Sequence, residues 1–328
     1  MELSNLNSIK SIKYRHITLK HPKMVAMLKI QDEILSAIRE FLRKQGFIEI
    51  LAPIIGPATD PGIRGAKQVM IDFYGQKFRL MSSMILYKQM AISSVTKIFS
   101  LSPNIRIEPK KSAKTGRHLA EFRQIDLEEA YATYEDSMHL AEKMIVYVVK
   151  DVKKKCFKEL EIFSRKIKVP KTPFKRLTHE QAVEVVRKLG FKMGENEEIP
   201  WEAEEALSAQ HSEPFWITDY PLKARGFYYL EDPKTNKLRD FDLILPEGFG
   251  EVISGGEREH EYKKVVDRMK KSGEDPKKYK WYLSMLKAGV PPSSGFGIGV
   301  ERLTRWICGL EKIWEAVPFP KVPGIASP

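Results

Sequence analysis

The stretch GFGIGVERL, residues 295–303, places three alternating glycines before a glutamate and an arginine. Glycine removes the side chains from one face of a strand, so a flat ligand can lie against the backbone there. We therefore expect a Gly-rich strand that runs into a helix, with Arg302 at the start of that helix. A packing role for the glycines is the alternative, but three in alternation favour a ligand.

The composition is that of a globular protein. The chain has 328 residues, of which 42% are apolar and 30% charged, so it can bury a large core. Its net charge of +12 suits nucleic acid, nucleotide phosphates or simple solubility. The two cysteines, Cys156 and Cys308, are far apart, so we expect a reduced, cytoplasmic protein with neither a disulfide framework nor a zinc site.

Hydrophobic periodicity predicts an α+β fold. We expect a helix over 23–45, and an edge or bulged strand in FIEILAPII (47–55), because it carries Pro53. Strands over 101–108 and 119–131 are expected to form a long hairpin. Further elements are a helix from about 134, a strand over 239–245 and a mainly helical insertion at about 160–212 with little chemistry in it.

Charged side chains recur at every second position in the predicted hairpin. This spacing puts them on one face of each strand, although a solvent-exposed face would also explain the charges. The face would carry Arg106, Glu108, Phe122, Gln124, Asp126 and Glu128. The connecting loop adds donors of the type that bind phosphate, namely Lys110, Lys111, Lys114, Arg117 and His118.

A second candidate site lies in GEVISGGEREHEY, residues 250–262. Glu251 and Ser254 offer hard oxygen ligands, which suit Mg²⁺ held together with substrate phosphates. A glycine turn between a strand and a charged helix is the alternative interpretation of this segment.

Together these motifs resemble the catalytic core of class II aminoacyl-tRNA synthetases of the aspartyl/asparaginyl subgroup. FIEILAPII resembles motif 1, IRIEP with GRHLAEF resembles motif 2, and GFGIGVERL resembles motif 3. The resemblance covers nearly the whole chain from about residue 20. It implies an antiparallel sheet flanked by helices, one catalytic domain over residues 1–328, and a homodimer formed through motif 1 with Pro53 at its interface.

The resemblance also implies a role for each matching residue, with ATP as substrate and Mg²⁺ as cofactor. Arg106, Arg302 and Glu251 would be catalytic. The ATP site would use Arg106 on the α-phosphate, Glu108 on the adenine amino group, Phe122 and Arg302 on the two faces of adenine, Arg117 and His118 on the outer phosphates, and Glu251 with Ser254 on the metal.

The amino-acid pocket implied by the resemblance is aspartate-like. In MILYKQ, residues 84–89, Lys88 matches the lysine with which aspartyl enzymes hold a carboxylate. The other expected aspartate ligands are Ser83, Asp126, Tyr228 and Arg258. Ile85 replaces the glutamine of the aspartyl pattern, so the bound aspartate could take either orientation.

The expected function is AMP-forming asparagine synthesis from aspartate and ammonia, through an aspartyl-β-adenylate. We expect no anticodon-binding OB-fold, because the predicted catalytic helix starts near residue 23, and therefore no tRNA partner. Such a chain resembles archaeal asparagine synthetases related to asparaginyl-tRNA synthetase. Ammonia is favoured as the nitrogen donor because neither cysteine segment resembles an amidase nucleophile.

Three alternatives remain open at this point. The first is an aspartyl- or asparaginyl-tRNA synthetase that works without the OB-fold, which the basic run at 150–176 would favour. The second is a paralogue that modifies a protein side chain. The third is a non-catalytic regulatory paralogue, which we rank below the others because the ATP-site residues are present.

Overall fold

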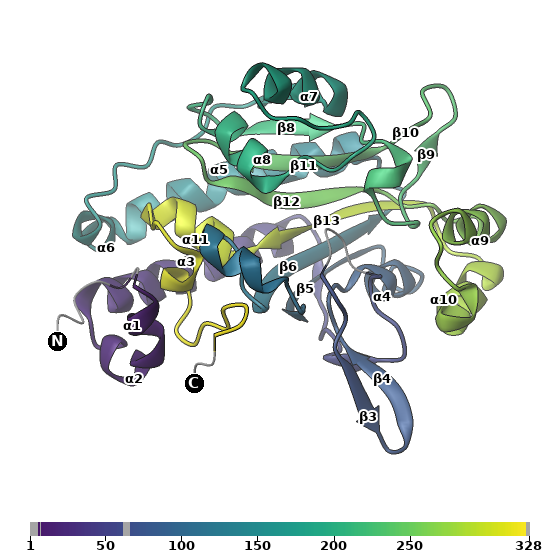
Figure 1. The fold of residues 1–328 in the computed structure, drawn as a ribbon, viewed down its shortest axis with the longest axis horizontal. Coiled ribbons are helices and arrows are strands. Elements are labelled where there is room, and N and C mark those ends of the chain that lie inside the picture. The colour runs from purple at the N-terminus through teal and green to yellow at the C-terminus, as the bar shows by residue number, and fades with distance from the viewer. Residues whose placement is uncertain (1–5, 7, 62–65, 326–328) are drawn as a thin grey trace.

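An eight-stranded sheet forms the centre of the computed structural model, which describes residues 6, 8–61 and 66–325 (Figure 1). The strand order is β1-β5-β6-β13-β12-β11-β8-β7, and every pairing is antiparallel except those of β1 with β5 and β7 with β8 at the two edges. The strands are β1 (Ile48–Glu49), β5 (Lys97–Ile105), β6 (Glu121–Ala130), β7 (Lys175–Thr178), β8 (Phe215–Thr218), β11 (Asp240–Leu245), β12 (Gly250–Glu257) and β13 (Ser293–Gly299). This is the α+β architecture that the sequence predicts.

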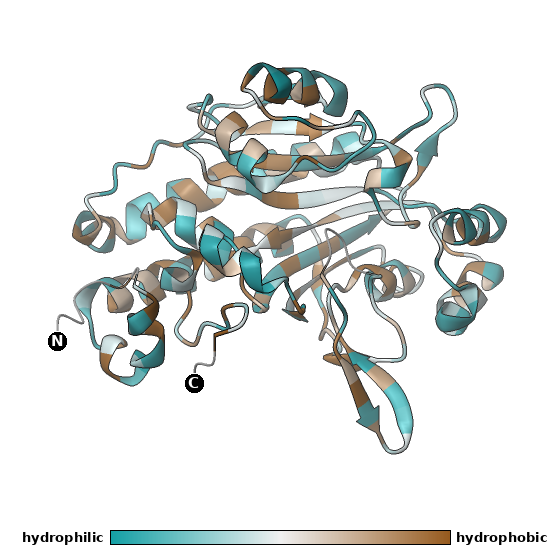
Figure 2. Ribbon diagram, in the orientation of Figure 1, coloured by the Kyte–Doolittle hydropathy of each residue, from teal (hydrophilic) through white to brown (hydrophobic). Residues whose placement is uncertain are grey.

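The two faces of this sheet differ in polarity. Apolar side chains such as Leu127, Ile253 and Phe296 belong to one large core with three helices, α3 (Pro22–Lys44), α5 (Tyr134–Lys155) and α11 (Val300–Cys308). Figure 2 shows the apolar residues concentrated along the central strands, whereas outer helices such as α9 (Tyr262–Lys271) are largely hydrophilic. Since side chains alternate along a strand, the polar residues of the same strands face the opposite side.

Local sequence explains where the long helices begin and end. Pro22 occupies the first turn of α3, and Gly46, with a φ of 84°, follows its end. Thr133 and Asp136 form the capping box that starts α5. The helices predicted over 23–45 and from about 134 are therefore confirmed.

The remaining elements cover the polar face and the edges of the sheet. One cluster joins α4 (Ile85–Ala91) to α9 and α10 (Lys280–Ala288), and another packs α7 (His179–Lys188) and α8 (Trp201–Ser208) against β8. Small elements complete the fold, namely α1 (Ile9–Lys13), α2 (Arg15–Thr18), α6 (Phe157–Ile162), the three-stranded sheet of β2 (Ile55–Gly56), β3 (Met70–Phe73) and β4 (Gln76–Leu80), and the pair β9 (Glu231–Asp232) with β10 (Lys237–Leu238).

Two local expectations need correction. FIEILAPII is not one strand, because β1 and β2 lie on either side of Pro53, which has no N–H for a ladder. The hairpin pairs as predicted, but β5 ends at Ile105. Arg106 and Glu108 therefore lie in the connection beyond the strand and not on its face. In the 160–212 segment, β7 extends the sheet beside β8.

Candidate active site

A cavity of about 590 Å³ opens on the polar face of the sheet. All thirteen residues that the sequence singled out for ATP, aspartate or metal line it. They are Ser83, Lys88, Arg106, Glu108, Arg117, His118, Phe122, Asp126, Tyr228, Glu251, Ser254, Arg258 and Arg302. The fold thus brings together residues that are up to 219 positions apart in the sequence.

The glycines of β13 make room for the acidic side chains of β6. A Cβ at Gly295 would lie 2.3 Å from Glu128 Oε2, and one at Gly297 would lie 3.0 Å from Asp126 Oδ1. A Cβ at Gly295 would also lie 2.2 Å from the Leu127 carbonyl oxygen, so an alanine there would clash with backbone, and one at Gly297 would press on the Asp126 carboxylate. The alternating glycines therefore let β13 pass directly beside the charged side chains of β6.

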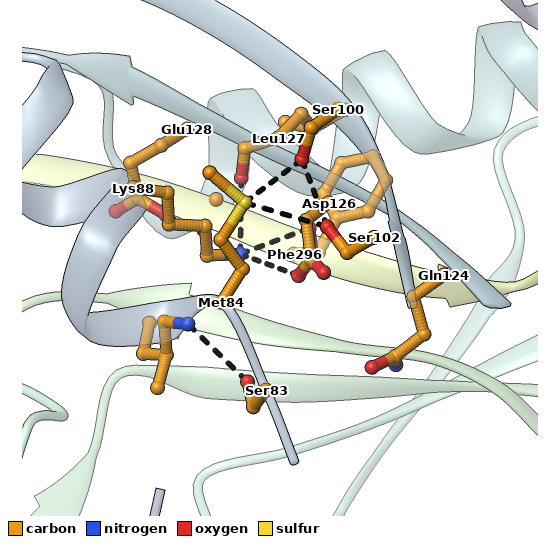
Figure 3. Close-up of polar contacts among 12 residues, drawn as sticks. Ser83, Met84, Lys88, Ser100, Ser102, Gln124, Asp126, Leu127, Glu128 and Phe296 are labelled. Atoms are coloured by element: carbon orange, nitrogen blue, oxygen red, sulfur yellow. Dashed lines mark hydrogen bonds and ion pairs between the residues drawn. The ribbon is translucent and has the colours of Figure 1, made fainter. Parts of the chain in front are cut away.

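Lys88 is buried among acceptors, with only 2% of its surface exposed. Figure 3 shows its Nζ donating to Asp126 Oδ1 at 3.3 Å, and to the backbone oxygens of Leu127 and Phe296 at 3.1 Å each. Glu128 Oε2 lies 3.5 Å away. Burial lowers the pKa of Lys88 from its ordinary value, and the neighbouring carboxylates oppose this shift.

Arg258 and Glu128 form a second buried ion pair beside Lys88. Arg258 donates from Nε to Glu128 Oε1 at 2.9 Å and from Nη2 to Glu128 Oε2 at 3.1 Å. Burial alone would lower the pKa of Arg258, but Glu128 holds it above its ordinary value. Within the described part of the chain, Arg258 Nη1 and Asp126 Oδ2 are buried atoms without a hydrogen-bond partner. Unpaired buried polar atoms are costly, so these two are candidate ligand contacts.

Tyr228 and Ser83 frame the same end of the cavity. The Tyr228 hydroxyl donates to Asp60 Oδ1 at 2.8 Å, and burial together with Asp60 raises its pKa well above the ordinary value. Ser83 Oγ accepts from the backbone N–H of Ile85 at the start of α4. Asp60 was not predicted to line the cavity. Its carbonyl accepts from Ser82 Oγ at 3.2 Å, and Ala58 packs against Ile85 of α4.

Arg106, Phe122 and Arg302 form a further part of the cavity wall. The Arg106 guanidinium lies 5.0 Å from the centre of the Phe122 ring and donates to the Ser82 carbonyl at 2.9 and 3.1 Å. Arg302, on the first turn of α11, donates to the Glu251 carbonyl at 2.9 Å and lies 3.2 Å from Glu251 Oε1. A ring and two guanidinium groups thus offer flat surfaces together with positive charge.

A bulge between β11 and β12 brings Glu251 and Ser254 to one side. The register passes from Ile253 opposite Leu243 to Glu251 opposite Ile244, which leaves Val252 as the extra residue. Residues three apart then share a face, which alternation alone would forbid. Two hard oxygen donors beside a cationic cavity fit Mg²⁺ that is completed by phosphate oxygens and water. No cluster of three or more metal-ligating residues occurs in the ranges that the structure describes.

The insertion also contributes to the cavity, which the sequence did not predict. Glu198, Trp201 and Glu202 line it. The Trp201 ring lies 4.3 Å from the His118 ring, and Arg117 pairs with Glu204 at 2.6 Å. These contacts join segments more than 80 residues apart, so no local sequence pattern could indicate them.

Comparison with known proteins places this fold and site in a family. The class II tRNA synthetases (D, K and N) match residues 7–323. Relatives include asparagine–tRNA ligase of Pyrococcus abyssi, 35% identical over 319 residues that make up 96% of this chain and 72% of the relative, and that of Thermus thermophilus, 34% identical over 322 residues. The structure of asparaginyl-tRNA synthetase from Pyrococcus horikoshii complexed with asparaginyl-adenylate superimposes with a TM-score of 0.91 at 33% identity, covering 98% of this chain and 74% of that one.

These comparisons contradict two expectations. Asparagine synthesis from aspartate and ammonia is not supported, since the relatives are named for joining asparagine to tRNA. The expected lack of a tRNA partner conflicts with the same names. The expected lack of a tRNA partner depended on where the chain starts, and asparagine synthesis depended on that and on Lys88. The similarity along 96% of the chain is the stronger evidence.

Three observations indicate the same family: the residues that line the cavity, the antiparallel sheet that carries the three motifs, and the match over nearly all of the chain. The ligase fold and the match over residues 7–323 lead to one conclusion: this chain belongs to the class II aminoacyl-tRNA synthetases of the aspartyl, lysyl and asparaginyl group.

Proposed function

We propose that this protein activates asparagine with ATP and transfers it to tRNA. The observation that carries the proposal is the pair of unpartnered buried atoms, Asp126 Oδ2 and Arg258 Nη1, in the wall of the cavity. One is an acceptor and the other a donor. A carboxamide offers the complement, because its NH₂ donates and its carbonyl oxygen accepts.

The bonds of Lys88 support asparagine over aspartate. An ammonium group has three N–H donors, and Lys88 directs its three to Asp126 and to two backbone carbonyls. A substrate carboxylate in this place would have to displace one of these contacts, and it would also set a second anion against Asp126. In this proposal Lys88 orients Asp126 and does not bind the substrate's side chain. Ser83 and Tyr228 bound the same pocket.

The nucleotide would occupy the other end of the cavity. Arg106 would bind the α-phosphate and the attacking carboxylate, and Phe122 and Arg302 would hold the adenine ring, with Glu108 beside its amino group. Arg117 and His118 would contact the outer phosphates. Glu251 and Ser254 would hold Mg²⁺, which screens the phosphate charge. Attack of a carboxylate on the α-phosphorus requires positioning and cationic groups more than it requires a base.

A dimer through the motif 1 segment is part of the same proposal. Leu51 is 96% exposed, and its neighbours Ile48 and Ile54 are more than half exposed. Apolar side chains exposed this close together indicate a surface that another protein covers. A second copy of the chain would bury them, and we infer that residues 1–328 act in this dimer as one catalytic domain with the insertion at 160–212.

Two assays test the proposal. Exchange of pyrophosphate into ATP should depend on asparagine, with aspartate giving a rate at least about tenfold lower, since a wrong charge in a hydrogen-bonded pocket leaves polar groups unpaired. Charging of purified tRNA with labelled asparagine then tests the transfer step. Exchange that depends on aspartate and not on asparagine would contradict the assignment.

A further inference from the structure

We infer that Glu204, on helix α8 of the insertion, is a positioning residue for the phosphate end of the nucleotide site. The inference rests on the proposed ATP-dependent function and gives part of the 160–212 segment a role in it. Glu204 does not line the cavity. It would act through Arg117 and through the backbone of Glu251, which do line it.

A single carboxylate oxygen joins these two parts of the site. Glu204 Oε1 accepts from Arg117 Nη2 at 2.6 Å and from the backbone N–H of Glu251 at 2.8 Å. The first donor lies in the motif 2 connection and the second in β12. One oxygen on α8 therefore fixes the spacing between the expected phosphate ligand and the expected metal ligand.

The link is buried, which makes it strong. Arg117 and Glu204 are only 5% and 2% exposed. A charge-assisted hydrogen bond shielded from water is stronger than an exposed pair, and the loss of one partner leaves a buried charge unpaired. The backbone is adapted to this link as well. A Cβ at Gly250 would lie 1.9 Å from Arg117 Nη2, and the φ of Gly250 is +74°, so a side chain there would displace the guanidinium.

The same helix restrains the second expected phosphate ligand. Arg117 Nη1 donates to the Trp201 carbonyl at 3.0 Å, and the Trp201 ring lies 4.3 Å from His118. Arginine has five N–H donors, and the bonds of Arg117 to Trp201 and Glu204 use one on each terminal nitrogen. The guanidinium can therefore keep both protein contacts and still bind a phosphate oxygen. A guanidinium fixed in this way loses less entropy when the nucleotide arrives.

The experiment compares Glu204→Gln and Glu204→Ala with a matched control, Glu195→Gln. Glu195 lies in the same insertion, its side chain is 74% exposed, and its ion-pair partner is Arg187 and not Arg117. ATP affinity is measured by calorimetry without amino acid, and KM values for ATP and asparagine are measured by pyrophosphate exchange. Glu204→Gln keeps the acceptor and removes the charge, so it should weaken ATP binding several-fold, and Glu204→Ala by about tenfold or more.

The expected pattern is selective. The KM for ATP should rise in both Glu204 variants while the KM for asparagine stays unchanged, and Glu195→Gln should match the native chain. If Glu204→Ala does not fold, Glu204→Gln decides. ATP binding by Glu204→Gln equal to that of the control would overturn the inference, and so would an equal rise in both KM values, which indicates general distortion. Calorimetry with ATP needs no amino acid. If the native chain binds ATP but does not activate asparagine, the proposed function is refuted, and the effect of the Glu204 variants on ATP binding can still be measured. A native chain that binds no ATP overturns both.

Discussion

Lys88 Nζ lies 3.3 Å from Asp126 Oδ1, and the second carboxylate oxygen of Asp126 has no hydrogen-bond partner among the residues that the structure describes. The lysine thereby fixes one end of the carboxylate and leaves the other for a ligand. Buried polar atoms are almost always paired in folded proteins. Asp126 Oδ2 is one of several exceptions among the described residues, and it lies on a residue that lines the cavity.

Removal of the Lys88 charge should destabilise the fold. In Lys88→Met, Asp126 and Glu128 lose a cation at a site where Lys88 is only 2% exposed, and breaking a buried pair costs about 3–5 kcal/mol. Urea unfolding measures this loss. The control is Lys97→Met. Lys97 pairs with Glu129 across the same two strands, β5 and β6, but the Lys97 side chain is 38% exposed. Its loss should stay below about 1 kcal/mol, and equal losses would count against the buried network.

Asp126→Asn should impair recognition of the amino acid. The variant removes the negative charge, and its NH₂ group can take the position of Oδ2, where it would donate and not accept. The KM for asparagine should therefore rise by about tenfold to a hundredfold. The KM for ATP should stay unchanged. Ser100→Ala is the control, because Ser100 lies directly opposite Asp126 in the register but bonds to Ser102 and Met84 instead. An unchanged asparagine KM in Asp126→Asn would remove Asp126 from the pocket.

Arg302→Ala should stop formation of the adenylate. Arg302 contacts both the carbonyl and the carboxylate of Glu251. Loss of the Arg302 side chain therefore removes a cation and a flat surface from the proposed nucleotide site. The rate of pyrophosphate exchange should fall by about a hundredfold or more. Arg302→Lys keeps the charge without the planar group and should recover little of this loss. Full activity in either variant would be inconsistent with the motif 3 assignment.

Glu301 should make the stability depend on pH. Burial raises its pKa from 4.5 to about 7, although the Arg123 N–H, which donates to both carboxylate oxygens, opposes the shift. The folded chain therefore holds the proton more tightly than the unfolded chain. Its contribution is fully present below the unfolded pKa of 4.5 and is lost as the pH rises through 7, by an amount of about 3 kcal/mol.

Glu301→Gln tests this dependence, because glutamine cannot ionise. Its free energy of unfolding should change less between about pH 5 and about pH 8 than that of the native chain. Urea titrations at both values measure the difference. Parallel pH profiles for the two proteins would show that another group dominates.

Local patterns explain which parts of the fold could be predicted. The helices around Met27 and Met144, the β5–β6 hairpin and the strand–helix of motif 3 follow from periodicity and capping, which depend on neighbours in sequence. The position at which β5 ends does not follow from local patterns. The sequence therefore predicted Arg106 on the strand, whereas the strand ends one residue earlier, at Ile105. The bulge at Val252 likewise depends on pairing between strands.

The site was predictable as a set of residues but not as a set of bonds. The sequence identified Lys88 as a cation in a pocket, yet two of its acceptors are backbone oxygens of β6 and β13, whose directions depend on strand register. The contribution of Glu204 and Trp201 was missed for a related reason. They approach Arg117 and His118 from a helix more than 80 residues away in sequence.

The most direct test of the account is charging of tRNA by the native chain with ATP and Mg²⁺, with labelled asparagine and labelled aspartate supplied in parallel. We predict that asparagine becomes attached to tRNA and that aspartate is attached at a rate at least about tenfold lower. Attachment of aspartate alone, or activation of neither amino acid, would contradict the claim that Asp126 and Arg258 recognise a carboxamide.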